Sequence, residues 1–433
     1  MQRIKNVLLI GSIFAYSALL LKEPFEVYWA YVIYLIFTPF YLMRFGIPRL
    51  PVFLFLPLLL IGLVYVTLEF NTYMLFFKIF IGYLACMVFY YWVLQDYQFD
   101  VTQIYRLYMK AAVIVAIIGF VQFVSFQVGF VRGYNYGWLF NKWGVVTGGF
   151  GMRLNSVFSE PAYYGATMAP AFFTSLYNWI SRKPIYISKL MSALIIITYI
   201  LTSSGVAYIG VMLSIVFLMI NYGVIRYSLF FIPIIILSAN WAYENVPDFR
   251  IRWDSTIDIY TSENIYSYDV HGSSFVLYNN NHVAWENFKR NPLFGTGLGS
   301  HSIAFDKYSL TNVEGAVQLE FNRADANSMF LRLMSETGLY GLTIMIVFLF
   351  RHWLSKKRSA QPEFWVISNS CLMVIVLYLL RQGHYFINGL PFFIWLYYFT
   401  SLRNRGVLRS NAAAEEERAN TLNGDGQPAV LTP

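Results

Sequence analysis

Long apolar runs recur along almost the whole chain, and they constrain its fold more than any other feature of the sequence. Of the 433 residues, 58% are hydrophobic and only 12% are charged, against about 25% in an ordinary soluble domain. So few charges cannot give a folded core of this size a polar surface. Because about 20 mostly apolar residues suffice to cross the hydrocarbon of a bilayer, the sequence predicts a polytopic membrane protein.

The apolar runs are continuous, whereas the strands of a membrane β-barrel alternate apolar and polar residues over segments of about ten. The predicted fold is therefore an all-α, polytopic transmembrane helical bundle of about 12 spans. Breaks at charged residues, proline and glycine place these spans at 7–21, 27–43, 51–68, 72–94, 111–130, 158–180, 188–201, 206–222, 227–243, 328–350, 364–380 and 386–402. A single helix over 188–222 would be about 50 Å long, so a tight turn is expected at Ser203, Ser204 and Gly205.

Basic residues gather in alternate loops, which sets the predicted orientation. With the N-terminus in the cytoplasm, the inner loops hold Arg44, Arg49, Arg106, Lys110, Arg182, Lys183, Lys189, Arg226, Arg351, Lys356, Lys357 and Arg358. The short outer loops hold far fewer. This bias is typical of a bacterial inner-membrane protein, here with an even number of spans and both termini inside. It also explains the net charge of +8 without a nucleic-acid partner.

The N-terminus resembles a secretory signal, because Arg3 and Lys5 precede an apolar run. A charged stretch at 22–24 follows it in place of a small-residue cleavage site, so we expect an uncleaved first span. The two cysteines, Cys86 and Cys371, both fall in apolar runs. Their position argues against a disulfide framework.

The predicted spans leave one large connection. Residues 1–243 hold spans 1 to 9 with a moderate periplasmic loop at 131–157, and residues 328–402 hold spans 10 to 12. Between them, 244–327 is a large periplasmic loop, and connections of that length are usually functional. A major-facilitator transporter would place its long loop centrally and in the cytoplasm, which disfavours that class. Residues 403–433 are too polar to pack and are predicted to form a disordered cytoplasmic tail.

Charged residues recur where the outer loops meet the spans. One motif runs from Arg153 through Glu160 to Gly165. Its glutamate stands before a proline at a helix start, a position that suits capping as well as catalysis. Another motif, from Arg381 to His384, enters the last span from outside.

Two further motifs belong to the large loop and to the span after it. At 285–299, Arg290 precedes three glycines, which allow anion contact, although a plain turn is the simpler explanation. At 323–341 the polar residues include Arg323, Asp325 and Asn327. Ionisable residues at membrane depth are costly and usually face a cavity. The four motifs together therefore predict one site that opens outward.

The order of these motifs resembles that of the O-antigen polymerase and O-antigen ligase superfamily. The resemblance covers about residues 150–345 at motif level, and the late large loop extends it loosely over the whole chain. It implies a GT-C-like bundle in the inner membrane. It also implies a glycosyltransferase that works at the periplasmic face on glycans linked through diphosphate to undecaprenol, without a nucleotide sugar.

Two positions separate the members of this superfamily. Ligases carry a histidine before the asparagine that matches Asn327, whereas this chain has Ala326. Ligases also carry an arginine shortly before the tryptophan that matches Trp285, whereas this chain has asparagines at 279–281 and then His282. Both departures favour a polymerase that joins undecaprenyl-diphosphate-linked repeat units into a long surface polysaccharide, O-antigen or a related polymer.

The implied reaction needs a positive charge for the departing diphosphate and a base for the attacking hydroxyl. Arginine offers phosphate a planar, permanently charged fork, and a carboxylate or histidine suits the base. Glu160 is the first candidate base, Asp325 the second, and His282 and His301 follow. The predicted catalytic residues are Glu160, Asp325 and Arg153. The predicted substrate-binding residues are Arg323, Arg381, His282, Arg290, Asn327 and His384.

Neither a metal nor a cofactor is expected, because the sequence has no Asp-x-Asp pair or His and carboxylate cluster of the kind that holds Mg²⁺ or Mn²⁺ on a diphosphate. The expected partners are the lipid-linked glycan and the bilayer, with a polysaccharide chain-length regulator as a further candidate. Aromatic side chains of the outer segments suit an interface belt or stacking on sugars. They are Tyr134, Tyr136, Trp138, Trp253, Tyr266 and Tyr278.

Two alternative functions stay open. One is an O-antigen ligase that transfers glycan to the lipid A core. The other is a flippase or transporter of lipid-linked oligosaccharides. The charges of a flippase should line a cavity through the protein, whereas the charges found here are expected to gather at one face.

Overall fold

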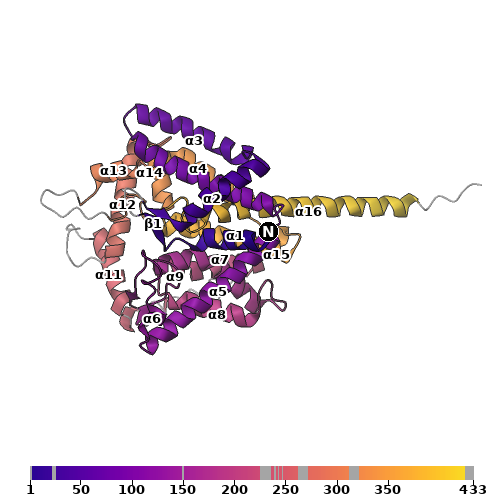
Figure 1. Ribbon diagram of the computed structural model, residues 1–433, viewed down its shortest axis with the longest axis horizontal. Helices are drawn as coiled ribbons and strands as arrows, with labels where there is room; N and C mark the ends of the chain where they lie inside the picture. The colour runs from indigo at the N-terminus through magenta and orange to yellow at the C-terminus, as the bar shows by residue number, and fades with distance from the viewer. Residues whose placement is uncertain are drawn as a thin grey trace, which may run out of the picture.

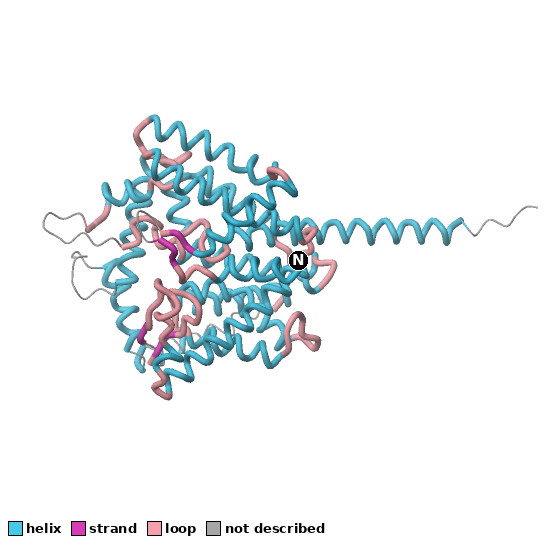
Figure 2. The backbone as a smooth tube through the Cα atoms, viewed as in Figure 1, coloured by secondary structure: helices cyan, strands magenta, loops and turns pink. Residues whose placement is uncertain are grey.

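The structure is a computed structural model, and it describes residues 2–21, 26–148, 151–224, 236–237, 240–241, 243–245, 247–261, 272–311 and 321–424. These residues are mostly helical (Figure 2). The helices are α1 (Gln2–Phe14), α2 (Trp29–Phe45), α3 (Arg49–Thr67), α4 (Tyr73–Asp96), α5 (Val101–Gln127), α6 (Val131–Tyr134), α7 (Pro161–Ile180), α8 (Lys189–Leu201), α9 (Gly205–Tyr222), α11 (Pro247–Thr261), α12 (Gly272–Arg290), α13 (His301–Tyr308), α14 (Met329–His352), η2 (Lys356–Arg358), α15 (Pro362–Arg381) and α16 (Leu390–Gly424). Two antiparallel strand pairs join β1 (Leu19–Leu21) to β2 (Val27–Tyr28) and β3 (Val146–Thr147) to β4 (Met152–Arg153).

Six helices of the described part are long and apolar enough to cross a membrane, which confirms the predicted helical membrane fold. They are α3, α4, α5, α9, α14 and α15. Helices α1, α2 and α8 are apolar but shorter. The count of about 12 spans and the periplasmic position of the large loop stay predictions. The predicted span at 227–243 lies mostly outside the described residues.

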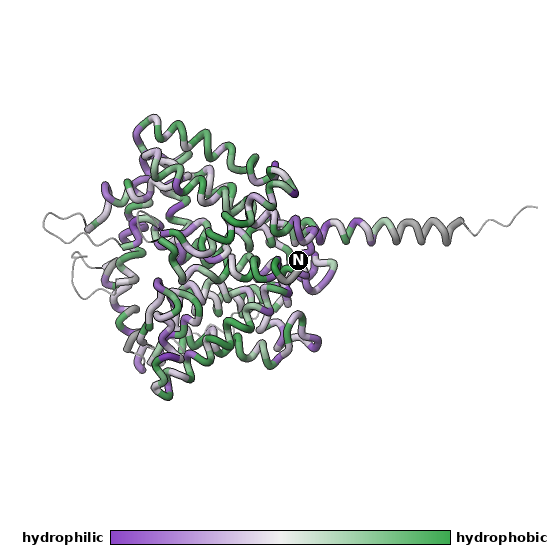
Figure 3. The backbone as a smooth tube through the Cα atoms, viewed as in Figure 1, coloured by the Kyte–Doolittle hydropathy of each residue, from purple (hydrophilic) through white to green (hydrophobic). Residues whose placement is uncertain are grey.

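The outside of the bundle carries large apolar side chains. Leu35 on α2 is 75% exposed, Phe53 on α3 is 71% exposed and Phe350 on α14 is 76% exposed. Each would be costly in water, at roughly 25 cal/mol per Å² of apolar surface, but not in hydrocarbon. Apolar residues line the helices along their lengths, and polar residues gather toward their ends (Figure 3). This distribution fits a bundle whose solvent is lipid.

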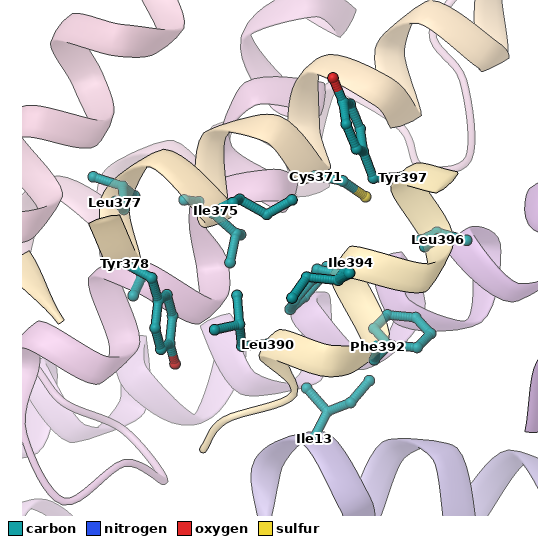
Figure 4. Packing of buried hydrophobic residues seen from close by; sticks show 14 of the residues in the cluster. Ile13, Cys371, Ile375, Leu377, Tyr378, Leu390, Phe392, Ile394, Leu396 and Tyr397 are labelled. Carbon is teal, nitrogen blue, oxygen red and sulfur yellow. The ribbon is translucent and has the colours of Figure 1, made fainter. Parts of the chain in front are cut away.

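Helix α15 lies inside the bundle, where it packs against α7, α9, α14 and α16. Figure 4 shows Cys371, Ile375 and Tyr378 of α15 beside Leu390 and Ile394 of α16. All five side chains are buried. Both cysteines of the chain are buried and free, in agreement with their position in apolar runs.

The two ends of the bundle differ in character (Figure 1). Helices α11, α12 and α13 gather at one end, called the α12 end below, and α16 extends from the other, called the basic end. The strand pairs lie toward the α12 end (Figure 2). At the basic end the buried carboxylate of Asp96 holds Lys5 at 2.8 Å and Arg44 at 2.5 Å, which ties α4 to α1 and α2.

The first predicted span, 7–21, is wrong in its second half. Helix α1 ends at Phe14, and the chain is extended from Leu19 as strand β1. A distant side chain explains the difference. Asn141 accepts a hydrogen bond from the N–H of Leu19 and donates one to its carbonyl, each at 2.7 Å. The backbone of Leu19 therefore bonds outside a helix.

The other boundaries mostly follow the apolar pattern. The expected turn is confirmed, because α8 ends at Leu201 and α9 begins at Gly205. Helix α16 begins after residue 386, since Asn388 and Gly389 have positive φ angles of 50° and 74°. It then continues to Gly424, through part of the segment predicted to be a disordered tail. Alanine and glutamate at 412–417 are strong helix formers, which accounts for that difference.

Candidate functional site

Asp325 and His384, both predicted as site residues, lie in hydrogen-bond contact at the α12 end. Nε2 of His384 lies 2.8 Å from Oδ2 of Asp325, and the side chains are 28% and 11% exposed. The hydroxyl of Tyr163, in the first turn of α7, lies 3.5 Å from the same nitrogen. Three segments far apart in the sequence therefore meet here, and His384 stays accessible to a substrate.

The Asp325 carboxylate is held by the tight loop before α14. Asn322, Ala326 and Asn327 all have φ between 54° and 60°. Oδ1 of Asp325 accepts hydrogen bonds from Nδ2 of Asn322 at 2.8 Å and from the N–H of Asn327 at 3.0 Å. Burial alone would raise the pKa of Asp325, but the charge and hydrogen bond of His384 and these two bonds outweigh it and hold the pKa well below its usual range. Asp325 is therefore an ionised acceptor for His384.

Gly383 leaves no space for a side chain beside this loop. A Cβ atom at Gly383 would overlap the backbone oxygen of Asp325. We expect Gly383→Ala to push Asp325 and His384 apart and to lower the free energy of unfolding by about 1–3 kcal/mol, the usual cost of overpacking. Gly144→Ala is the control, because its Cβ would meet no atom within 4 Å. Thermal unfolding of both variants checks the difference, and equal midpoints would contradict the packing.

A second charged pair lies inside α14. Nε of Arg332 donates to Oε1 of Glu336 at 2.9 Å, and the side chains are 3% and 0% exposed. Arg332 also donates to the carbonyl of Gly383 at 3.0 Å, and its guanidinium lies 4.3 Å from the ring centre of Tyr385. The hydroxyl of Tyr385 donates to the other oxygen of Glu336 at 2.9 Å. The pair therefore fixes both residues that flank His384.

Sequence reasoning did not single out Arg332. The signal was present, because an arginine and a glutamate four residues apart face the same side of a helix. Charged residues inside an otherwise apolar span are also rare and usually functional. Glu336 falls within the motif at 323–341.

The glycine motif at 285–299 packs against a break in α14. Gly338 interrupts that helix with φ 58° and ψ −151°. The N–H of Gly297 donates to the carbonyl of Glu336 at 2.8 Å, and a Cβ on Gly295 would overlap the backbone there. The glycines thus allow two backbones to meet, which agrees with the turn explanation.

Two carboxylates act on groups of this cluster: Glu26, just before β2, and Glu160, just before α7. Oε2 of Glu26 lies 2.5 Å from Nζ of Lys142, which also donates to the hydroxyl of Tyr28 at 2.7 Å. Burial opposes ionisation of Glu26, but hydrogen bonds from Lys142 and Tyr28, with the charge of His384, lower its pKa. Glu160 is exposed and its side chain caps no N–H of α7. Burial raises the pKa of Tyr28 most, the hydrogen bond and charge of Glu26 raise it further, and the charge of Glu160 adds to the shift.

Two of the predicted arginines lie on segments that lead into this cluster. Arg153 is half-buried in β4, on the chain that runs on to Glu160. Arg381 is the half-buried last residue of α15, three residues before His384. Glu26, Tyr28 and Lys142 were not predicted, because each is a lone polar residue in a short or aromatic loop.

The remaining predicted residues lie with α12 and α13. Arg323 donates two hydrogen bonds to Asp306 of α13, so its guanidinium is already engaged. Arg290, at the end of α12, lies 4.9 Å from the ring centre of Tyr308 and lines a polar cavity of about 470 Å³. His282 is half-buried on α12. Arg290 and Arg323 are thus directed to α13, whereas the sequence prediction put them in one hollow with Asp325.

His301, a later candidate base, is fully buried, and its Nε2 lies 3.1 Å from Oδ1 of Asn280. Burial and the charge of Arg332 lower the pKa of His301 to about 3, although Asp325 opposes the shift. Below about pH 6.5 the unfolded chain therefore binds a proton that the folded protein does not. The free energy of unfolding falls as the pH is lowered through this range. We expect a loss of about 2 kcal/mol from this residue between pH 7 and pH 5. Denaturant unfolding at both pH values should show a shallower dependence for His301→Gln, and parallel curves would contradict the assignment.

The outer aromatic residues divide between packing and exposure. Tyr134 packs on Phe126, and Tyr136 packs on Trp143. Trp138 and Trp253 are exposed, and Tyr278 is half-buried on α12. Tyr266 lies outside the described residues.

The arrangement at the α12 end gives a histidine oriented by a carboxylate, with further carboxylates and arginines on the adjoining segments. Within the described ranges, no three histidine, cysteine, aspartate or glutamate side chains come together as a metal site. A comparison of the chain with protein-family models found no match, and a comparison with curated proteins found none either.

Proposed function

We propose that this protein polymerises oligosaccharide repeat units carried on undecaprenyl diphosphate into a long surface polysaccharide, at the periplasmic face of the bacterial inner membrane. The observation that carries the proposal is the accessible pair of Asp325 and His384. The two residues come from separate polar motifs of the sequence, at 323–341 and 381–384, and they meet at one end of an apolar helical bundle. That position suits a lipid-linked donor whose sugars stay in water.

His384 takes the role of general base. Its Nε2–H donates to the ionised Asp325, which leaves the lone pair of Nδ1 to accept a proton. The acceptor hydroxyl gives this proton to His384 as its oxygen bonds to the anomeric carbon of the donor. The bond from that carbon to the diphosphate breaks, and its electron pair leaves with the lipid diphosphate. Asp325 then stabilises the imidazolium.

Stabilisation of the negative charge that develops on the leaving diphosphate is assigned to Arg153 and Arg381. Both lie on segments that lead into the cluster at His384. Donors aimed at a developing charge are usually the largest single contribution to catalysis. Glu160 is assigned to binding the acceptor sugar, because its carboxylate can accept hydrogen bonds from the sugar hydroxyls.

Reconstitution tests the function directly. The full chain in liposomes is supplied with one defined undecaprenyl-diphosphate-linked repeat unit, and the products are sized on a gel. A ladder of lengths on undecaprenyl diphosphate supports polymerisation. Transfer only to added lipid A core would favour the ligase, and movement of the unit across the bilayer without transfer would favour a flippase. In cells, loss of a polymerase should leave single units on lipid A, whereas loss of a flippase should remove them too.

A further inference from the structure

An apolar groove follows α14 through the bundle. Its volume is about 330 Å³, and α14 contributes residues from Leu333 to His352. At about 1.5 Å per residue, this stretch covers most of the roughly 30 Å of bilayer hydrocarbon. The opposite wall comes from α3, α4 and α16, with Leu54, Leu58 and Ile394 among its side chains. A groove of this length and chemistry fits one hydrocarbon chain.

At the basic end the groove meets three exposed arginines. Arg351 is next to the groove residue His352, and Arg49 is next to the groove residue Leu50. Arg405 of α16 donates to the backbone carbonyl of Arg351 at 3.1 Å. Among the described ion pairs, no carboxylate joins any of these arginines. Their positive charge is therefore available to a ligand.

His352 adds a polar group to the same end of the groove. It is 6% exposed, and its Nδ1 has no hydrogen-bond partner among the described atoms. Its ring lies between Phe348 and Tyr398, at 5.2 Å and 4.9 Å between ring centres. Both of these neighbours line the groove. A buried polar atom without a partner is costly, and a polar group on a ligand would supply one.

At the other end, the described residues that line the groove are uncharged, with Leu298, Tyr340 and Tyr385 among them. The charged groups behind Tyr385 are Arg332 and Glu336, which are buried and already paired. Charge complementarity therefore places an anionic headgroup at the basic end and the chain terminus toward Tyr385.

We propose that this groove binds one acyl chain of an anionic phospholipid, whose phosphate is held by Arg351 and Arg405. Each basic residue near an anionic lipid surface contributes about 1 kcal/mol, and burial of the chain adds the apolar contribution. The lipid is a bound structural component at the end opposite His384. The site goes beyond the proposed glycan chemistry and does not depend on it.

Native mass spectrometry of the full chain, released from nanodiscs of phosphatidylglycerol or phosphatidylcholine, tests the site. We expect one phosphatidylglycerol to be retained and phosphatidylcholine to be lost. The double variant Arg351→Gln with Arg405→Gln should weaken retention about thirty-fold. Arg182→Gln with Lys183→Gln is the matched control, because it removes the same charge from exposed positions in the loop between α7 and α8. Retention in the control should be unchanged.

A second variant tests the groove itself. In the variant Ile344→Trp, a larger side chain fills the groove at a position that is 52% exposed. The melting temperature of this variant is compared with that of the unchanged protein. Retention should fall while the fold persists. Equal retention of both lipids, equal loss in the charge control, or a retained undecaprenyl lipid that ignores the arginine substitutions would overturn the proposal. The lipid measurement needs no glycan, so it stands or fails separately from the polymerase assay.

Discussion

Replacing His384 with Ala is expected to lower the rate of chain extension by 10² to 10⁴, the range that a positioned general base usually contributes. The reason is geometric, because His384 is the partly exposed partner of an ionised carboxylate at 2.8 Å. Asp325→Asn should act on the same step, since an amide can hold the imidazole in the wrong tautomer. Both rates are measured by reconstitution with a defined lipid-linked repeat unit.

His282→Ala is the matched control for that experiment. It also removes a histidine from the α12 end, but one on α12 itself and not the partner of Asp325. Its rate should stay within a few-fold of the unchanged protein. If His282→Ala removed activity and His384→Ala did not, the base would lie on α12 and the proposed mechanism would be wrong.

Removing the carboxylate of Glu336 is expected to destabilise the fold by about 3–5 kcal/mol. Glu336→Ala would leave the guanidinium of Arg332 buried without its countercharge, and breaking one half of a buried pair has a cost of this size. The hydroxyl of Tyr385 would lose its acceptor as well. Thermal or denaturant unfolding in detergent gives the change in stability.

Two comparisons isolate the cause. The double variant Arg332→Met with Glu336→Leu removes both charges and should recover most of the stability, because apolar replacement of a whole buried pair is often tolerated. Glu286→Gln breaks an exposed pair with Lys289, and it should change the stability little. A Glu336→Ala protein as stable as Glu286→Gln would show that the buried pair is not needed.

The long spans were predictable because their signal is local. Helices α3, α4 and α9 begin and end within about two residues of the predicted spans, since an apolar run bounded by charge or glycine carries its own boundaries. The first span was not predictable in full. Its end at Phe14 depends on a bond between Leu19 and Asn141, a residue on another loop. No local pattern carries that information.

The candidate site divides in the same way. Asp325 and His384 stood out as polar residues beside spans, but their pairing needs α14 and α15 to be placed. Arg290 stood out equally, and the fold turns it toward Tyr308. Residue type and spacing therefore identified some of the charged residues of the site, and only the packing of the helices decided which of them meet. The contact between Arg332 and Glu336 needs no such packing, because both residues lie within one helix, four positions apart.

The break at Gly338 ties a loop to a membrane helix through main-chain atoms. Leu339 and Tyr340 donate their N–H groups to the carbonyls of Pro292 and Leu293, at 2.8 Å and 2.9 Å. Bonds of this kind are indifferent to side-chain identity but depend on the number of residues between partners. Apart from Gly295 and Gly338, where a side chain would meet the opposite backbone, this seam should tolerate many point substitutions over evolutionary time and very few insertions or deletions.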